Sequence, residues 1–80
     1  MDISRQAFDL KPFLIRQGAL LLWGVPLTRQ ADVYRIRQLY KLSNFFAEVC
    51  YDPATGQPIG ICSFSSVDLQ QYSGDFLGGH

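Results

Sequence analysis

Residues 39–64 read LYKLSNFFAEVCYDPATGQPIGICSF, and two short turn sequences divide this stretch into three strand-like runs. The first turn is Ser43-Asn44, where asparagine tolerates the positive φ that a two-residue hairpin turn requires. In the second turn, residues 52–57, Pro53 presets its φ and Gly56 supplies a left-handed position. The stretch therefore predicts three antiparallel strands joined by two tight hairpins.

The first turn also fixes which side chains of its hairpin share a face. One face becomes almost wholly apolar, because it pairs Leu42–Phe45, Tyr40–Ala47, Gln38–Val49 and Ile36–Tyr51. The opposite face sets Arg35 across from Asp52, and it places Glu48 diagonal to Arg37 and Lys41. Since the register does not force this sorting of apolar and charged residues, the sorting supports the register.

Pairing of Asp52 with Gln57 extends both faces onto the third strand. The apolar face is the expected core face, and its members are Tyr34, Ile36, Tyr40, Leu42, Phe45, Ala47, Val49, Tyr51, Gly60, Cys62 and Phe64. The expected outer face carries an apolar strip rimmed by charges, made of Leu39, Phe46, Cys50, Ile59 and Ile61 with Arg37 and Glu48. In this register Cys50 and Cys62 lie on opposite faces.

The sequence before residue 33 predicts helices followed by one strand. Residues 1–17 favour two helical pieces, and Pro12 suits the first turn of the second piece, at 13–17. A strand at 13–16, turning back through Gln17-Gly18, is the alternative. The apolar run 19–25 predicts a strand covered on both sides, followed by a polar loop at 28–32 and an alternating strand at 33–42.

At the other end, Ser65 or Ser66 is expected to cap a final helix that runs to Tyr72, and residues 73–80 are expected to form a flexible tail. The predicted fold class is α+β. It is a four-stranded antiparallel meander with N-terminal helical segments and a short C-terminal helix, in one domain over residues 1–72.

The pattern LYxL, two-residue turn, FxxEVxYD over residues 39–52 resembles short single-domain bacterial proteins of uncharacterised function. The similar part covers residues 13–72, where Gly18-x-Leu20-Leu21 also belongs to it. This chain differs at Ser43-Asn44, where the pattern leads one to expect Asp-Gly. The resemblance implies a fold, implies no activity, and carries over no catalytic or binding residue.

Composition excludes several classes of protein. Eighty residues allow one small domain, and an apolar content of 48% argues against a disordered chain. The net charge of +0 gives no overall basic excess for nucleic acid or for an anionic membrane. Two cysteines without a visible export signal predict free thiols and a cytoplasmic location.

Catalytic and metal-binding constellations are not evident. The one histidine, His80, is the last residue, and no cluster of Cys, His or carboxylates has the spacing of metal ligands. Cys50, expected beside Arg37, is the most plausible reactive thiol. We therefore expect no enzyme, no cofactor and no small-molecule substrate.

The outer apolar strip is the surface that sequence points to for function. It is either covered by the N-terminal helices, giving three layers, or free to bind a protein partner or a second copy. A sheet edge offers a second route, by strand addition. The predicted function is a small non-catalytic interaction module or adaptor, with a homodimer as one form. The alternative is a nucleic-acid-binding module that uses a stripe of Arg35, Arg37 and Lys41.

Overall fold

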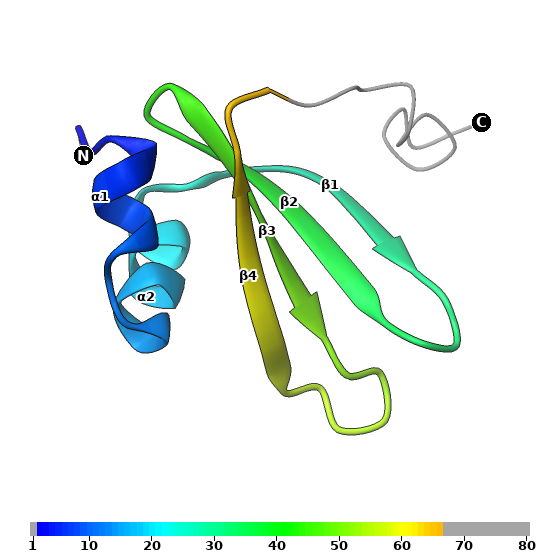
Figure 1. The fold of residues 1–80 in the computed structure, drawn as a ribbon. Helices are drawn as coiled ribbons and strands as arrows, with labels where there is room; N and C mark the ends of the chain where they lie inside the picture. The colour runs from blue at the N-terminus through cyan, green and yellow to red at the C-terminus, as the bar shows by residue number, and fades with distance from the viewer. Residues whose placement is uncertain (1, 67–80) are drawn as a thin grey trace.

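The computed structural model describes residues 2–66, which form two helices packed against one face of a four-stranded sheet (Figure 1). The elements are α1 (Arg5–Asp9), α2 (Phe13–Trp23), β1 (Val25–Ala31), β2 (Ile36–Leu42), β3 (Phe45–Tyr51) and β4 (Pro58–Phe64). The strand order is β1-β2-β3-β4, and each neighbouring pair is antiparallel. The predicted α+β meander is confirmed. The expected C-terminal helix, which would follow its cap at Ser65 or Ser66 and run to Tyr72, and the tail at 73–80 lie outside the described residues.

Local chemistry explains where the helices begin and end. The Ser4 hydroxyl caps α1 by accepting a hydrogen bond from the Ala7 amide at 3.1 Å. Pro12 precedes α2, and the Gly24 amide donates to the Leu20 carbonyl at 2.9 Å where α2 ends. A Cβ atom at Gly24 would lie 2.6 Å from the Leu20 carbonyl oxygen. The tight exit from α2 into β1 therefore requires glycine.

The predicted strand at 19–25 and the predicted loop at 28–32 are both wrong. Residues 19–23 are the last turns of α2, and β1 occupies Val25–Ala31. The alternative strand at 13–16 is wrong as well, since those residues open the same helix. A short continuous apolar run does not distinguish a covered strand from a helix, because neither periodicity is visible in it. Pro26 is tolerated because β1 is an edge strand.

The predicted register of the first hairpin is confirmed. Leu42 pairs with Phe45, and the pairing continues without a break to Ile36 and Tyr51. Ser43 adopts a φ of 57° in the turn, where the sequence had pointed to Asn44 as the residue that tolerates positive φ. Tyr34, expected on the core face, instead lies in the hairpin tip between β1 and β2 and is 84% exposed.

The second hairpin has the predicted turn but a different register beyond it. The Asp52 amide donates to the Gln57 carbonyl at 2.9 Å, as the turn sequence implies. An irregularity at Ile59 then shifts the pairing by one residue, so Val49 faces Ile61. A shift of one residue exchanges the two faces of a strand. The expected faces of Gly60, Ile61, Cys62 and Phe64 are therefore wrong: Ile61 points into the core, and the others do not.

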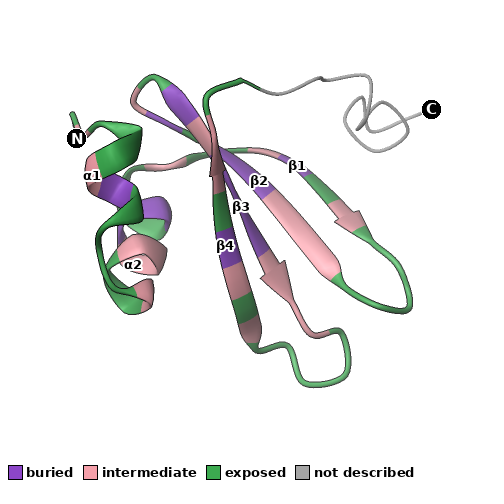
Figure 2. Ribbon diagram, in the orientation of Figure 1, coloured by how far each residue is buried: buried purple, intermediate pink, exposed green. Residues whose placement is uncertain are grey.

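The core lies between the helices and the face of the sheet that carries Tyr40, Leu42 and Phe45 (Figure 2). Its buried members are Phe8, Ala19, Leu20, Tyr40, Leu42, Phe45, Ala47, Val49 and Ile61. The Phe8 and Phe45 ring centroids lie 5.3 Å apart at an interplanar angle of 57°. The helices thus cover the core face, so the alternative in which they cover the outer face as a third layer is wrong.

Candidate interaction surfaces

The predicted outer strip is only partly assembled. Leu39, Phe46, Cys50, Arg37 and Glu48 do share the outer face of β2 and β3. Leu39 is 1% exposed and Glu48 is buried, while Phe46 is half-buried. Of the two remaining candidates, Ile61 faces the core at 9% exposure and Ile59 lies at the irregularity in β4 at 62% exposure. These residues do not form one exposed apolar strip.

The polar groups of this face are paired with one another. The Arg37 guanidinium lies 3.8 Å from the Glu48 carboxylate and also donates a hydrogen bond to the side chain of Gln30. The diagonal pairing of Glu48 with Arg37 that the sequence predicted is confirmed. Arg35 lies in the exposed hairpin tip and Lys41 is exposed on β2. Arg37 lies between them and is engaged with Glu48 and Gln30. The basic stripe therefore offers two separated exposed charges and no continuous basic track, and nucleic-acid binding gains no support from it.

Both cysteines are free thiols, and the register places both on the outer face, so the prediction of opposite faces is wrong. The Cys50 thiol donates to the Glu48 carboxylate, with Sγ 3.6 Å from Oε1. Burial raises the pKa of the Cys50 thiol, and the neighbouring Glu48 charge raises the pKa further. Thiolate formation at Cys50 is therefore suppressed, which is the opposite of what a catalytic cysteine requires.

Alkylation provides a direct measure of this suppression. In a Cys62→Ser variant we expect Cys50 to react with iodoacetamide more slowly than a model thiol at pH 7.5. Because its pKa is raised, the reaction should accelerate only at a higher pH than the model thiol needs. A Glu48→Gln variant removes the repulsive charge and should react faster than its parent. Faster reaction of Cys50 than of the model thiol would restore the reactive-thiol hypothesis.

The edge strand β4 is protected by the helices. The Arg16 guanidinium donates to the Ile61 carbonyl at 3.3 Å, and Arg5 donates to the Ser63 carbonyl at 3.1 Å. Arg5 also donates to the Ser63 hydroxyl, which donates in turn to Asp9 at 2.6 Å. Since these side chains engage carbonyls that an added strand would use, addition at β4 is disfavoured.

Within residues 2–66, four exposed large apolar side chains gather on α2, on the side that faces away from the sheet. Leu14, Ile15, Leu21 and Leu22 are 74%, 57%, 65% and 72% exposed. With 3.6 residues per turn, these four positions and Gly18 fall within about 120° of the helix circumference. Ala19 and Leu20, on the other side, are buried against the sheet. We call Leu14, Ile15, Gly18, Leu21 and Leu22 the α2 outer face.

The α2 outer face carries no charge. Arg16 is the one ionisable residue of α2, and its guanidinium is turned towards β4 and the Phe13 ring. More apolar side chains stand at the two ends of the helix: Leu10, Trp23 and Val25 are 86%, 49% and 57% exposed. Scattered apolar residues are normal on a surface, but a contiguous group of this kind marks a contact site.

Sequence reasoning missed the α2 outer face because residues 19–25 were interpreted as a covered strand. A signal was present in the sequence. From Phe13 to Trp23 no proline interrupts the chain, and Leu14, Leu21 and Gly18 recur at helical spacing.

Neither a membrane span nor a metal cluster is found in the described part of the chain. No helix within residues 2–66 is long and apolar enough to cross a membrane. No three His, Cys, Asp or Glu side chains among these residues lie close enough together to hold a metal ion.

Comparison with known proteins found no match for this chain among family models, curated proteins or solved structures. The resemblance of residues 39–52 to uncharacterised bacterial proteins therefore stays a prediction.

Proposed function

We propose that this protein is a small non-catalytic interaction module that self-associates through the α2 outer face, in the reducing environment that suits its free cysteines. The observation that carries the proposal is the exposure of four large aliphatic side chains on the solvent side of a single helix. Water contact at such a surface is unfavourable, and an apolar partner surface removes it. The partner is a second copy of the same chain.

The residues of the α2 outer face are arranged symmetrically about Gly18. Leu14 and Leu22 stand four positions before and after it, and Ile15 and Leu21 stand three positions before and after it. A second helix that crosses antiparallel at Gly18 sets Leu14 against the partner's Leu22, and Ile15 against the partner's Leu21. One patch then serves both copies, as a two-fold dimer requires.

The glycine at the crossing point also favours close approach. A Cβ atom at Gly18 would meet nothing within 4 Å, so no side chain of the same copy fills the space in front of it. Glycine in the middle of a helix costs about 0.5–1 kcal/mol relative to alanine. Packing of a partner helix against the bare backbone is a compensation for that cost.

The area is sufficient for a small dimer. Burial of one leucine or isoleucine side chain contributes about 1.5–3 kcal/mol. At about 25 cal/mol for each Å² of apolar surface, this corresponds to a buried area of roughly 60–120 Å² per side chain. The four aliphatic side chains of the α2 outer face, with Leu10 and Val25, then supply roughly 500 Å² per copy, or about 1,000 Å² per pair. A specific interface needs about 1,000 Å² in total. The dimer falls at that lower bound, so we expect association in the micromolar range.

A lipid surface is a less suitable occupant. Helices that lie on membranes carry lysine and arginine on the polar face beside the apolar one. In α2 the single arginine is engaged with the sheet, and the whole chain has a net charge of +0. The α2 outer face therefore lacks the cationic rim that holds such a helix at anionic headgroups.

Sedimentation and a disulfide trap test the dimer together. The parent chain should sediment at twice 9.0 kDa at high concentration and dissociate on dilution. In a background without Cys50 and Cys62, Gly18→Cys should form an intermolecular disulfide under mild oxidation. When two helix axes are about 8–10 Å apart, the Cα atoms that face each other at the crossing are roughly 3–6 Å apart. This distance overlaps the Cα–Cα distance of about 4.4–6.8 Å that a disulfide allows.

Val33→Cys in the same background is the matched control, because Val33 is 82% exposed but lies at the β1–β2 hairpin tip. It should remain monomeric on a non-reducing gel at the protein concentration that cross-links Gly18→Cys. A chain that stays at 9.0 kDa at every concentration, or equal cross-linking at both positions, contradicts the proposal. Flotation of the parent with phospholipid vesicles while it remains monomeric would assign the α2 outer face to lipid instead.

A further inference from the structure

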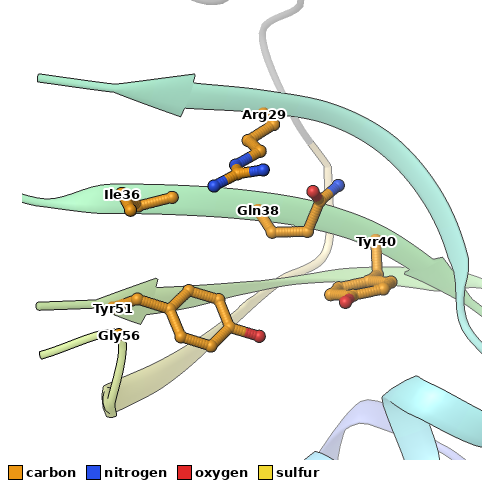
Figure 3. A pocket seen from close by; sticks show the side chains of 6 residues that line it. All are labelled: Arg29, Ile36, Gln38, Tyr40, Tyr51 and Gly56. Carbon is orange, nitrogen blue, oxygen red and sulfur yellow. The ribbon is translucent and has the colours of Figure 1, made fainter. Parts of the chain in front are cut away.

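A hollow lies on the core side of the sheet beyond the reach of the helices, and it is independent of the α2 outer face. It has a volume of about 320 Å³ and is lined by Arg29, Ile36, Gln38, Tyr40, Tyr51 and Gly56 (Figure 3). All except Gly56 project from the same face of β1, β2 and β3, as the pairings Arg29–Gln38 and Ile36–Tyr51 show. Gly56 contributes from the turn between β3 and β4. Ligand sites begin at about this volume.

Besides Arg29, the polar groups of the hollow are the Gln38 amide and the hydroxyl groups of Tyr40 and Tyr51. The Gln38 amide nitrogen donates to the Thr28 carbonyl at 2.9 Å and to the Leu39 carbonyl at 3.1 Å, which fixes its side chain. The Tyr51 side chain points towards Tyr40 (Figure 3). Burial, and to a smaller extent the neighbouring Tyr51, raise the pKa of Tyr40, so the Tyr40 hydroxyl stays neutral near pH 7.

The charge of the hollow is unbalanced. Arg29 places a guanidinium at the rim on the β1 side, and no Asp or Glu is among the lining residues. Asp32 and Asp52 are the acidic residues nearest in sequence to the lining residues, and their carboxylates accept hydrogen bonds from backbone amides. Asp32 accepts from the Tyr34 and Arg35 amides, and Asp52 accepts from the Ala54 amide. Within residues 2–66, the ion pairs formed by arginine involve Arg5 and Arg37, and not Arg29.

The arrangement combines one cation, hydroxyl groups and an apolar floor. A guanidinium prefers a carboxylate, to which it donates two parallel hydrogen bonds. Tyrosine rings and Ile36 suit a flat or branched apolar body, and a tyrosine hydroxyl adds a further donor. A neutral ligand would leave the guanidinium without a matching charge.

We infer that this hollow binds a small monocarboxylate with an aromatic or branched apolar body. The carboxylate is held by Arg29 and by the hydroxyl of Tyr51, while the apolar body lies on Ile36 and the ring of Tyr40. The site makes no covalent contact and catalyses nothing. Through this hollow, the proposed interaction module would also bind a small molecule.

Titration of the parent chain with phenylacetate, followed by amide chemical shifts, tests the site. Shifts should be confined to residues around the hollow, with Gln38, Tyr40 and Tyr51 among them, and should saturate in the millimolar range. Phenylacetamide has the same shape without the charge, and it should bind about tenfold more weakly or worse, because the charge-assisted hydrogen bonds are lost.

Variants assign the roles of the two donors. Arg29→Gln should weaken phenylacetate binding about tenfold and leave phenylacetamide binding unchanged. Tyr51→Phe should weaken phenylacetate binding about three- to tenfold, since it removes one hydroxyl. Arg35→Gln is the matched control, because Arg35 is an exposed arginine outside the hollow, and it should bind like the parent.

Three outcomes would overturn the inference. They are equal affinity for phenylacetate and phenylacetamide, unchanged phenylacetate binding in Arg29→Gln, and shifts that map to another part of the chain. Absence of any shift up to about 10 mM phenylacetate has the same consequence, since that concentration exceeds the expected dissociation constant. Dimerisation is measured separately, so failure of either proposal leaves the other standing.

Discussion

Replacement of Leu14 and Leu21 by glutamate is expected to keep the chain monomeric at concentrations where the parent dimerises. In the two-fold arrangement both substitutions lie close to the crossing at Gly18, so four carboxylates meet in a space that excludes water. Each lost leucine also removes about 1.5–3 kcal/mol of burial. Since 1.4 kcal/mol changes an equilibrium constant tenfold, the dimer should weaken by at least about a hundredfold.

The same substitutions should leave the fold intact. Leu14 and Leu21 are 74% and 65% exposed, and exposed positions of this kind change stability by about 0.5 kcal/mol or less. Light scattering coupled to size exclusion gives the mass, and far-UV circular dichroism with thermal melting reports the fold. A chain that stays dimeric with both glutamates in place does not use the α2 outer face.

A charge-matched control distinguishes this surface from the rest of the molecule. Val33→Glu with Ile59→Glu also adds two carboxylates at exposed apolar positions, which are 82% and 62% exposed. Both lie on the sheet side, at the β1–β2 hairpin tip and in β4. This variant should dimerise like the parent. Dissociation of the control alone would move the interface to the sheet, where sequence reasoning had placed Ile59.

Phe8→Ala is expected to destabilise the chain more than any other single truncation. Phe8 is 0% exposed, and its ring packs against Phe45 and so joins α1 to the sheet. Truncation of a buried phenylalanine costs about 3–5 kcal/mol. For 80 residues at about 0.05–0.15 kcal/mol each, the total free energy of unfolding is about 4–12 kcal/mol. The variant should therefore lose a large part of its stability.

Thermal and urea unfolding measure the loss. A change of 1 kcal/mol moves the melting temperature of a domain this size by about 4–8 °C, so Phe8→Ala should melt at least about 12 °C lower. Val33→Ala is the control, since Val33 is 82% exposed at the β1–β2 hairpin tip, and its melting temperature should stay within about 4 °C of the parent. Equal melting temperatures for Phe8→Ala and the parent would mean that α1 does not belong to the core.

The hairpin of β2 and β3 was predictable because its information is local. Ser43-Asn44 sets the turn, and alternation along both strands sets the faces, so the register from Leu42–Phe45 to Ile36–Tyr51 followed from neighbouring residues. The turn at 52–57 was predictable for the same reason, down to the bond between the Asp52 amide and the Gln57 carbonyl.

The face of β4 was not predictable in this way. No turn chemistry marks Ile59 as an extra residue, and a single extra residue reverses every side chain that follows it. The reversal is favourable in the folded state, because it brings Ile61 under the helices. That reason is visible only when the helices are in place.

Local sequence was enough to predict the α+β meander and the first hairpin, because turn residues and alternation act within a few positions of each other. Only the packing of the folded chain shows that Ile61 is buried and that the helices leave the outer face of the sheet uncovered. These outcomes depend on which apolar surfaces pack together in the folded chain. Because the hydrophobic effect is not directional, short sequence patterns do not specify that choice. Within the stretch 39–64 the turn residues fixed the hairpin of β2 and β3, while packing of α2 against the sheet left the α2 outer face exposed.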